Sequence, residues 1–303
     1  MSAQRATSTA ERISENMRRI EVTTRKLSAD AFHGGVQSRF RGRGMDFDEL
    51  REYEPGDDVR AIDWNASART GRTFVKKYRE ERQLTVVFVV DMSASGALGA
   101  GETTKRDQAV EIAGVLALAA LRSDHRVGLT LFTDKVEKYV PPFRGRAHTL
   151  RVVHDLISFV PSGRGTNLVD AVKTLRERLK RRAVVVILSD FLIDAPARAA
   201  AQRELSALAR RHDVVCIRTG DQHDRELPSV GLLTLEDVET GEIVELDTGS
   251  ARQREALAKA VRESEETLRA VIRTAEVDLL EVDTLKPYLG PLVGFFKSRG
   301  LRS

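Results

Sequence analysis

The sequence predicts an α/β fold, in which a doubly wound, mostly parallel sheet carries helices on both faces and follows a small β-rich module. From residue 84 onward, continuous runs of β-branched residues alternate with helical segments, which is typical of parallel strands covered on both faces. Residues 32–82 instead mix glycines, acids, bases and aromatics without a helical period. The length of 303 residues fits about two domains at roughly 150 residues each.

Residues 1–30 are assigned to an N-terminal extension, with an amphipathic helix predicted over residues 11–28. Ile13, Met17, Ile20 and Leu27 follow one another at spacings of four, three and seven, with charged residues between them. We expect this apolar stripe to pack against the body of the protein, with docking on a partner as the alternative. Residues 31–82 are then assigned to the β-rich module and residues 83–303 to the α/β domain.

The central elements alternate in type. Residues 84–90 predict a buried strand because they form a continuous apolar run, and residues 105–121 predict a helix because their apolar residues recur at helical spacing. Residues 136–140 follow a very short connection, which favours an antiparallel edge strand. The remaining central segments are strands at 127–132, 183–188 and 214–217 and helices at 146–159, 168–179 and 197–210.

The C-terminal part predicts a hairpin, a long charged helix, a strand and a closing helix. A turn at residues 239–242 joins the two hairpin strands, 232–236 and 243–246. In the long helix, Glu255 and Lys259 are spaced for an ion pair. The last three elements cover residues 250–274, 277–282 and 285–299.

Composition limits the classes of function. No apolar run approaches the roughly 18 to 20 residues that span a bilayer, so we expect a cytoplasmic protein with no membrane insertion. The net charge of +4 is too small to name a partner. A single cysteine, Cys216, excludes an intrachain disulfide and a thiol-rich metal cluster, and its apolar strand predicts a buried, inert thiol.

Familiar catalytic motifs are missing from the sequence. Residues 96–103 resemble a phosphate-binding loop, but Glu102 stands where a phosphate-binding lysine is required. The sequence contains no H-E-x-x-H, G-x-S-x-G or C-x-x-C motif. Nucleotide hydrolysis by this chain is therefore not expected.

Oxygen-bearing side chains gather where the predicted strands end. Ligands bind outside the carboxyl ends of parallel strands, so residues in these loops are expected to meet. An all-oxygen set suits Mg²⁺ first and Mn²⁺ second. Each residue alone is more typical of a helix N-cap, but their conjunction favours a metal site. The predicted ligands are Asp91, Ser93, Ser95, Thr166 and Asp190.

The D-x-S-x-S triplet, the threonine and the second aspartate together resemble the metal-ion-dependent adhesion site of von Willebrand factor type A domains, which have Rossmann-type layering. The resemblance implies that Ser93, Ser95 and Thr166 contact the metal directly, whereas Asp91 and Asp190 act mostly through coordinated water. It also implies an open metal position that a carboxylate of a partner fills. The metal would then bridge two proteins.

A second resemblance lies upstream. The stretches G-R-G-M-D-F at 42–47, R-E-Y-E-P-G-D-D-V-R at 51–60 and I-D-W-N-A-S-A-R-T-G at 62–71 resemble the signature of the bacterial "domain of unknown function 58" family. Proteins of that family look like binding partners of MoxR-type AAA+ ATPases. Many relatives carry N-terminal transmembrane helices, which this chain lacks, and this favours a cytosolic member. The resemblance implies a chaperone-like role on an unknown client, with ATP hydrolysis in the ATPase partner.

The same block supplies candidate partner contacts, for which two other roles remain open. Trp64 is either an exposed interface anchor or a buried residue. General burial trends favour a buried indole whose N–H makes a hydrogen bond. The aspartates are alternatively ion-pair partners of nearby arginines, namely Asp57, Asp58 and Asp63 with Arg51, Arg60 and Arg69. The candidate contacts are Tyr53, Asp57, Asp58, Trp64 and Asn65.

A metal-dependent protein-interaction module is the leading prediction, and two other functions are kept as alternatives. A metal-dependent phosphoesterase needs a positioned base or a second metal, and no histidine adjoins the strand-end residues. A nucleic-acid-binding surface in residues 39–82 would stack bases on its aromatics, but eleven bases and ten acids nearly cancel there. We therefore expect a binding protein and not an enzyme.

Overall fold

The structure is a computed structural model of the chain. It describes residues 9–26, 46–55, 57, 59, 62–79, 83–99, 101, 103–221, 229–236, 241 and 243–301. The chain divides into two compact units, a smaller one formed by Phe40–Gln83 and a larger one formed by the segments on either side of it.

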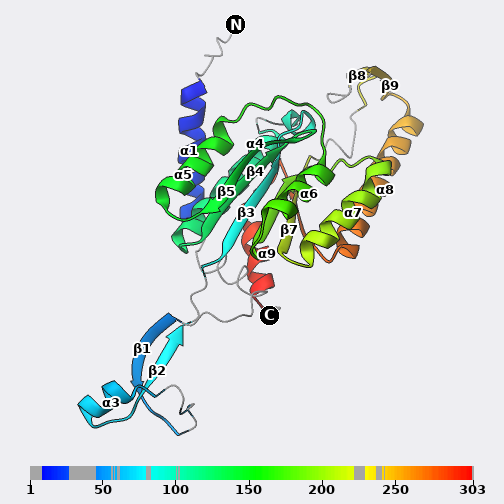
Figure 1. Cartoon of the computed structure of the whole chain (residues 1–303). Coiled ribbons are helices and arrows are strands. Elements are labelled where there is room, and N and C mark those ends of the chain that lie inside the picture. The colour runs from blue at the N-terminus through cyan, green and yellow to red at the C-terminus, as the bar shows by residue number, and fades with distance from the viewer. Residues whose placement is uncertain are drawn as a thin grey trace. The chain divides into compact units, whose positions relative to one another are not determined.

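The larger unit is built on a six-stranded sheet with the order β10-β7-β6-β3-β4-β5 (Figure 1). All neighbouring strands are parallel except β5, which pairs antiparallel with β4 at the edge. Counted along the chain, this is the order 3-2-1-4-5-6 of doubly wound sheets. The predicted α/β class, the mostly parallel sheet and the antiparallel edge strand are confirmed. The strands are β3 (Thr85–Asp91), β4 (Arg126–Phe132), β5 (Val136–Phe143), β6 (Val184–Ser189), β7 (Asp213–Gly220) and β10 (Asp278–Asp283).

Helices cover both faces of the sheet. On one face, α6 (Leu168–Arg178), α7 (Ala195–Ala209) and α8 (Ala251–Thr274) share a core cluster with Val87 and Val89 of β3. On the other face lie α4 (Lys105–Arg122) and α5 (Arg146–Ser158) (Figure 1). Because side chains on both faces of β3 are buried, its sequence is a continuous apolar run. The closing helix α9 (Leu289–Leu301) packs beside β10.

The N-terminal helix α1 (Thr9–Lys26) packs against α4 and α5. Ile20 is fully buried, and Arg19 forms an ion pair of 2.7 Å with Glu111 of α4. Since α1 covers its outer side, α4 is buried nearly all round, which explains why it is apolar on every face. Docking on the body, rather than on a partner, is confirmed. Leu27 of the predicted stripe lies outside the described residues.

A hairpin of β8 (Leu232–Glu236) and β9 (Ile243–Asp247) precedes α8, as predicted. The Thr248 hydroxyl closes its base by donating to the main-chain oxygen of Gly231 at 2.6 Å. In α8, Lys259 pairs with Glu263 at 3.8 Å and not with the predicted Glu255. No helix within the described ranges has both the length and the apolar character needed to cross a membrane.

The smaller unit contains an antiparallel pair, β1 (Asp46–Glu52) and β2 (Phe74–Arg79), with the short helix α3 (Trp64–Thr70) between them in sequence. The Asp63 carboxylate caps α3 by accepting from the N–H groups of Asn65 and Ala66, and Gly71 ends it in the left-handed region at φ 72°. The sequence prediction missed α3, because seven residues are too few to show a helical period.

Candidate metal site and its surroundings

Two carboxylates lie where the strand order of the sheet reverses. Asp91 is the last residue of β3, and Asp190 directly follows β6, the neighbouring parallel strand. Their exposed fractions are 6% and 5%. Open α/β sheets bind ligands at this position, because the connections on its two sides leave in opposite directions. The fold itself therefore pairs the two predicted aspartates.

The loop after β3 turns back on Asp91 and brings two hydroxyls beside it. The main-chain N–H of Ser93 donates to Asp91 Oδ1 at 2.9 Å, and the hydroxyl oxygens of Ser93 and Ser95 lie 3.1 Å apart. Both serines are buried, and Ser95 begins the short 3₁₀ helix η2 (Ser95–Ala97). Across the strands, Ser189 Oγ donates to Asp91 Oδ2 at 2.6 Å.

The loop that carries Thr166 lies against this turn. The main-chain oxygen of Arg164 accepts from the N–H of Ala94 at 2.8 Å, and the N–H of Asn167 donates to the Thr133 main-chain oxygen at 2.7 Å. These two bonds hold the half-buried Thr166 between the ends of β3 and β4. The loops bearing all five predicted ligands thus meet at one edge of the sheet.

The helix caps fall on other residues. Thr104 caps α4 and Asn167 caps α6 through side-chain hydrogen bonds, and Asp194 occupies the N-cap position of α7. None of the five predicted ligands caps one of these helices, and η2 has no side-chain cap. The alternative interpretation of the set as N-caps is therefore wrong, because each cap lies one or more residues nearer its helix.

The charges of the site suit a bound cation. Burial and the nearby charge of Asp190 raise the pKa of Asp91 to about 7, despite hydrogen bonds from Ser189 and Ser93 that lower it. Asp190 Oδ1 accepts from the Leu192 N–H at 3.3 Å, but its buried Oδ2 makes no hydrogen bond to the described residues. A buried carboxylate oxygen without a partner is costly unless a cation compensates it.

The donor set fits a hard divalent cation held jointly by acids and hydroxyls. In the described parts of the chain, no group of three or more His, Cys, Asp or Glu side chains is placed to hold a metal. A cation at this edge would therefore rely on the hydroxyls of Ser93, Ser95 and Thr166 as well as on the two carboxylates. Neutral and acidic oxygens are the ligands that Mg²⁺ and Mn²⁺ prefer.

Sequence reasoning missed Glu137 of β5, which anchors the Thr166 loop. Its carboxylate accepts from Thr133 Oγ1 at 2.6 Å, from the N–H and hydroxyl of Ser162, and from the Gly163 N–H at 2.9 Å. Burial raises the pKa of Glu137, but these hydrogen bonds outweigh it and lower the pKa to about 2. In an alternating edge strand, such an acid looks like an ordinary solvent-facing residue, so the sequence held no signal for it.

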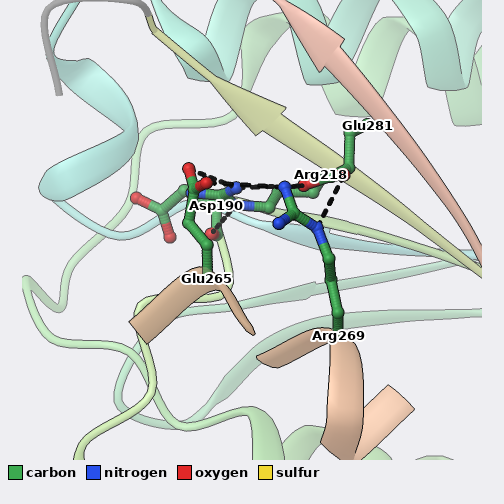
Figure 2. A network of polar contacts seen from close by, with 5 residues as sticks. All are labelled: Asp190, Arg218, Glu265, Arg269 and Glu281. Carbon is green, nitrogen blue, oxygen red and sulfur yellow. Dashed lines mark hydrogen bonds and ion pairs between the residues drawn. The ribbon is translucent and has the colours of Figure 1, made fainter. Parts of the chain in front are cut away.

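A buried ion network lies behind Asp190 (Figure 2). Arg218 of β7 forms ion pairs with Glu265 at 2.9 Å and Glu281 at 3.1 Å, and its Nε donates to the main-chain oxygen of Asp190 at 3.3 Å. Figure 2 shows the Asp190 carboxylate directed away from the Arg218 guanidinium. Arg218 thus holds the backbone of the loop and leaves the carboxylate available. Arg218 follows the apolar run of residues 214–217, but the sequence does not show which distant acids it pairs with.

The smaller unit places the candidate partner contacts as follows. Trp64 is 69% exposed, so the favoured prediction of a buried indole is wrong. α3 buries none of its residues, and the described part of the smaller unit, with two strands and one short helix, provides no second layer to cover the indole. Asn65 is exposed beside it, and Tyr53 is half-buried. Asp57 pairs with Arg51 at 2.6 Å, which confirms that alternative for this residue, whereas Asp58 lies outside the described residues.

Solved structures similar to this chain share little sequence with it. BatB from Bacteroides thetaiotaomicron is 14% identical with a TM-score of 0.46, and covers 73% of this chain and all of its own. A von Willebrand factor type A protein from Catenulispora acidiphila is 9% identical with a TM-score of 0.42, and covers 76% of this chain and 44% of its own. The order and direction of the strands define the α/β class independently of these likenesses.

Sequence comparisons cover more of the chain. The uncharacterized protein Rv1480 of Mycobacterium tuberculosis is 33% identical over 285 residues, which is 93% of this chain and 88% of that protein. The uncharacterized protein MAV169 of Mycobacterium avium is 37% identical over 139 residues, or 46% of this chain and 79% of that protein. The family model described as "Protein of unknown function DUF58" matches residues 49–267. The chain therefore belongs to the DUF58 family, as its upstream block predicted.

Proposed function

We propose that this protein is a metal-dependent protein-interaction module. Mg²⁺, or alternatively Mn²⁺, would be held by Asp91, Ser93, Ser95, Thr166 and Asp190. When bound, the cation supplies an open coordination position for a carboxylate of a partner protein. The observation that carries this proposal is the buried Asp190 oxygen, which has no hydrogen-bond partner among the described residues and lies at the reversal point of the sheet beside a second buried carboxylate.

The residues around the site have definite tasks in this proposal. Ser189 and the Ser93 N–H orient the Asp91 carboxylate, and Arg218 holds the Asp190 backbone. Glu137 fixes the loop that carries Thr166. Because each of these groups is held before any ligand arrives, little conformational entropy is lost on binding.

The partner we propose is a MoxR-type AAA+ ATPase, as the family resemblance implies. The pair would act in a chaperone-like way on a protein client, and ATP hydrolysis would belong to the partner. We propose a cytoplasmic location, in keeping with a single cysteine that is buried and unpaired. No observation favours the phosphoesterase, whose second metal or base would still have to be found, or the nucleic-acid surface, part of which lies outside the described residues.

The test is isothermal titration of Mg²⁺ and Mn²⁺ into chelator-stripped protein. We expect one saturable site in the wild type and none in the Ser93→Ala/Ser95→Ala variant, which removes two oxygens without adding bulk. Ser158→Ala, on α5, is the matched control and should bind as the wild type does. Metal binding that survives in the double variant would place the site elsewhere.

A second measurement tests the partner. The ATPase, purified separately, should bind the wild type in Mg²⁺ and lose that binding in chelator or in the double serine variant. Binding that is the same in both buffers would contradict a metal bridge, even if the titration shows a metal site.

A further inference from the structure

A cavity of about 380 Å³ opens beside the candidate metal site, between the loop after β6 and α8. Asp190 lines both the cavity and the metal site. Leu192 at the rim is 55% exposed, so the cavity is open to solvent. This volume falls in the lower range of pockets that bind small groups, roughly 300 to 1,000 Å³.

The walls of the cavity are apolar and its charged floor is already paired. Phe191, Leu192, Val261 and Leu268 supply apolar walls, and Ser264 and the buried Lys105, which already has a partner, complete the lining. On the floor, Arg218 and Glu265 form an ion pair of 2.9 Å, and Arg218 also binds the Asp190 main-chain oxygen (Figure 2). A charged ligand would have to disrupt these buried bonds, whereas an apolar side chain gains burial at no such cost.

We propose that this cavity receives an aliphatic side chain, such as Leu, Ile, Val or Met, from the protein segment whose carboxylate reaches the metal. The inference rests on the proposed function and specifies its partner chemistry. A segment whose acid reaches the Asp190 end of the metal site lies within reach of the cavity, because Asp190 lines the cavity and is also a proposed metal ligand. The acid would fill the metal position and the aliphatic residue would supply apolar burial.

Charge around the edge favours an acid-bearing segment as the occupant. Arg164, in the Thr166 loop, is exposed, and its side chain makes no hydrogen bond or ion pair with the described residues. Arg106 of α4 donates to the main-chain oxygen of Ser93 and adds a second positive charge. With a divalent cation offsetting Asp91 and Asp190, this edge is positively charged and complementary to an acidic peptide.

A variant of α8 can fill the cavity without disturbing the metal site. Ala260 lines the cavity and is exposed on the helix surface, so Ala260→Trp should fold and block the space. Ala256→Trp is the matched control, since Ala256 is equally exposed on α8 but does not line the cavity. Titration of Mg²⁺ into both variants tests whether the metal site survives.

The probe is a library of random peptides displayed on phage, selected on the wild type in Mg²⁺ and counter-selected in chelator. We expect the Mg²⁺-dependent peptides to carry an acid with an aliphatic residue within a few positions. Replacing that aliphatic residue by Ser in a synthetic peptide should weaken binding about tenfold or more, as should Ala260→Trp, whereas Ala256→Trp should not.

Three results would overturn the inference. They are Mg²⁺-dependent peptides that need only the acid, equal binding to the two tryptophan variants, and a library that yields no Mg²⁺-dependent peptide although Mg²⁺ itself binds. If Mg²⁺ does not bind the wild type at all, the proposed function fails first, and the titration identifies that failure separately.

Discussion

His212, in the turn between α7 and β7, is 3% exposed, and neither ring nitrogen hydrogen-bonds to a described residue. Burial lowers the pKa of His212 to about 4, and the charges of Arg211 and Arg182 add to this. The unfolded chain, with a pKa near 6.5, therefore takes up the proton first, and the contribution of His212 to stability falls by up to about 3 kcal/mol as the pH drops from about 6.5 towards 4. Asp91, whose folded pKa is raised to about 7, changes stability in the opposite direction over the same window. The contribution of His212 is therefore measured as the difference between the wild type and His212→Leu in urea unfolding at several pH values.

The free energy of unfolding of His212→Leu should rise relative to that of the wild type as the pH drops through this window, because the variant has no imidazole to protonate. His154→Gln, at an exposed position of α5, should leave the slope as it is in the wild type. If the two variants show the same slope, another group governs the loss of stability in this pH range.

The carboxylate of Glu137 anchors the loop that carries Thr166. Glu137→Gln would turn an amide donor towards the N–H groups of Ser162 and Gly163, which now donate to the carboxylate. We expect a loss of about 1 kcal/mol of unfolding free energy near neutral pH, after a discount for solvent screening, and weaker Mg²⁺ binding. Because the folded pKa of Glu137 is about 2, its contribution is present above pH 4.5 and declines as the pH falls towards 2.

The measurement for Glu137→Gln is urea unfolding at neutral and acidic pH together with Mg²⁺ titration. Glu177→Gln, on the exposed side of α6, controls for the loss of one surface charge. A stability difference between Glu137→Gln and the wild type that stays constant below pH 4 would contradict the role assigned to the carboxylate.

Among the elements, the contact of α1 with α4 depends on one glycine. A Cβ at Gly114 would lie 2.6 Å from Ile20 Cδ1 and 3.2 Å from two further carbons of that buried side chain. Gly114→Ala gains up to about 1 kcal/mol in helix propensity but costs roughly 1 to 3 kcal/mol in overpacking. We therefore expect a net destabilisation of about 1 kcal/mol, measured by urea unfolding.

A double-mutant cycle separates these two effects of Gly114→Ala. In an Ile20→Ala background the added methyl meets open space, so Gly114→Ala should become stabilising. The same free-energy change in both backgrounds would show that α1 does not rest on Gly114.

The regular elements were predictable because their signals are local. Strands such as β3 and β6 are buried on both faces, and this alone makes their sequences continuous apolar runs. The seven-residue α3 depends on its caps and gives no period, and the exposure of Trp64 depends on a missing second layer that no local pattern reports.

In the candidate site, too, some residues were predictable from local signals and others were not. Asp91 and Asp190 were predictable because each follows a recognisable strand, and parallel strands bring such residues to one edge. Glu137 and Arg218 were not, because their roles arise from contacts across 26 residues to Gly163 and 47 residues to Glu265. Such pairings depend on which strands and loops become neighbours, which single-sequence periodicity does not encode.

For the whole molecule, the structure implies that stability and metal binding oppose each other at Asp190. Its buried Oδ2 makes no hydrogen bond within the described parts of the chain and lies beside the second carboxylate, that of Asp91, which destabilises the metal-free fold. Asp190→Asn should therefore raise the stability of metal-free protein by about 1 to 2 kcal/mol, or a few degrees in Tm. In excess Mg²⁺ the wild type should instead be more stable than Asp190→Asn, because a bound ligand stabilises only the protein that binds it.

Thermal unfolding followed by circular dichroism, in chelator and in excess Mg²⁺, tests this reversal. Asp194→Asn is the matched control, since Asp194 lies in the same loop but is exposed and makes no capping hydrogen bond. Mg²⁺ should raise the Tm of Asp194→Asn as much as it raises the Tm of the wild type. If Asp190→Asn is less stable than the wild type in chelator, or gains equally from Mg²⁺, then the aspartate serves the fold and not a cation. If instead Asp190→Asn has the higher Tm in chelator and the wild type has the higher Tm in Mg²⁺, the buried charge of Asp190 destabilises the protein unless a ligand binds at this edge.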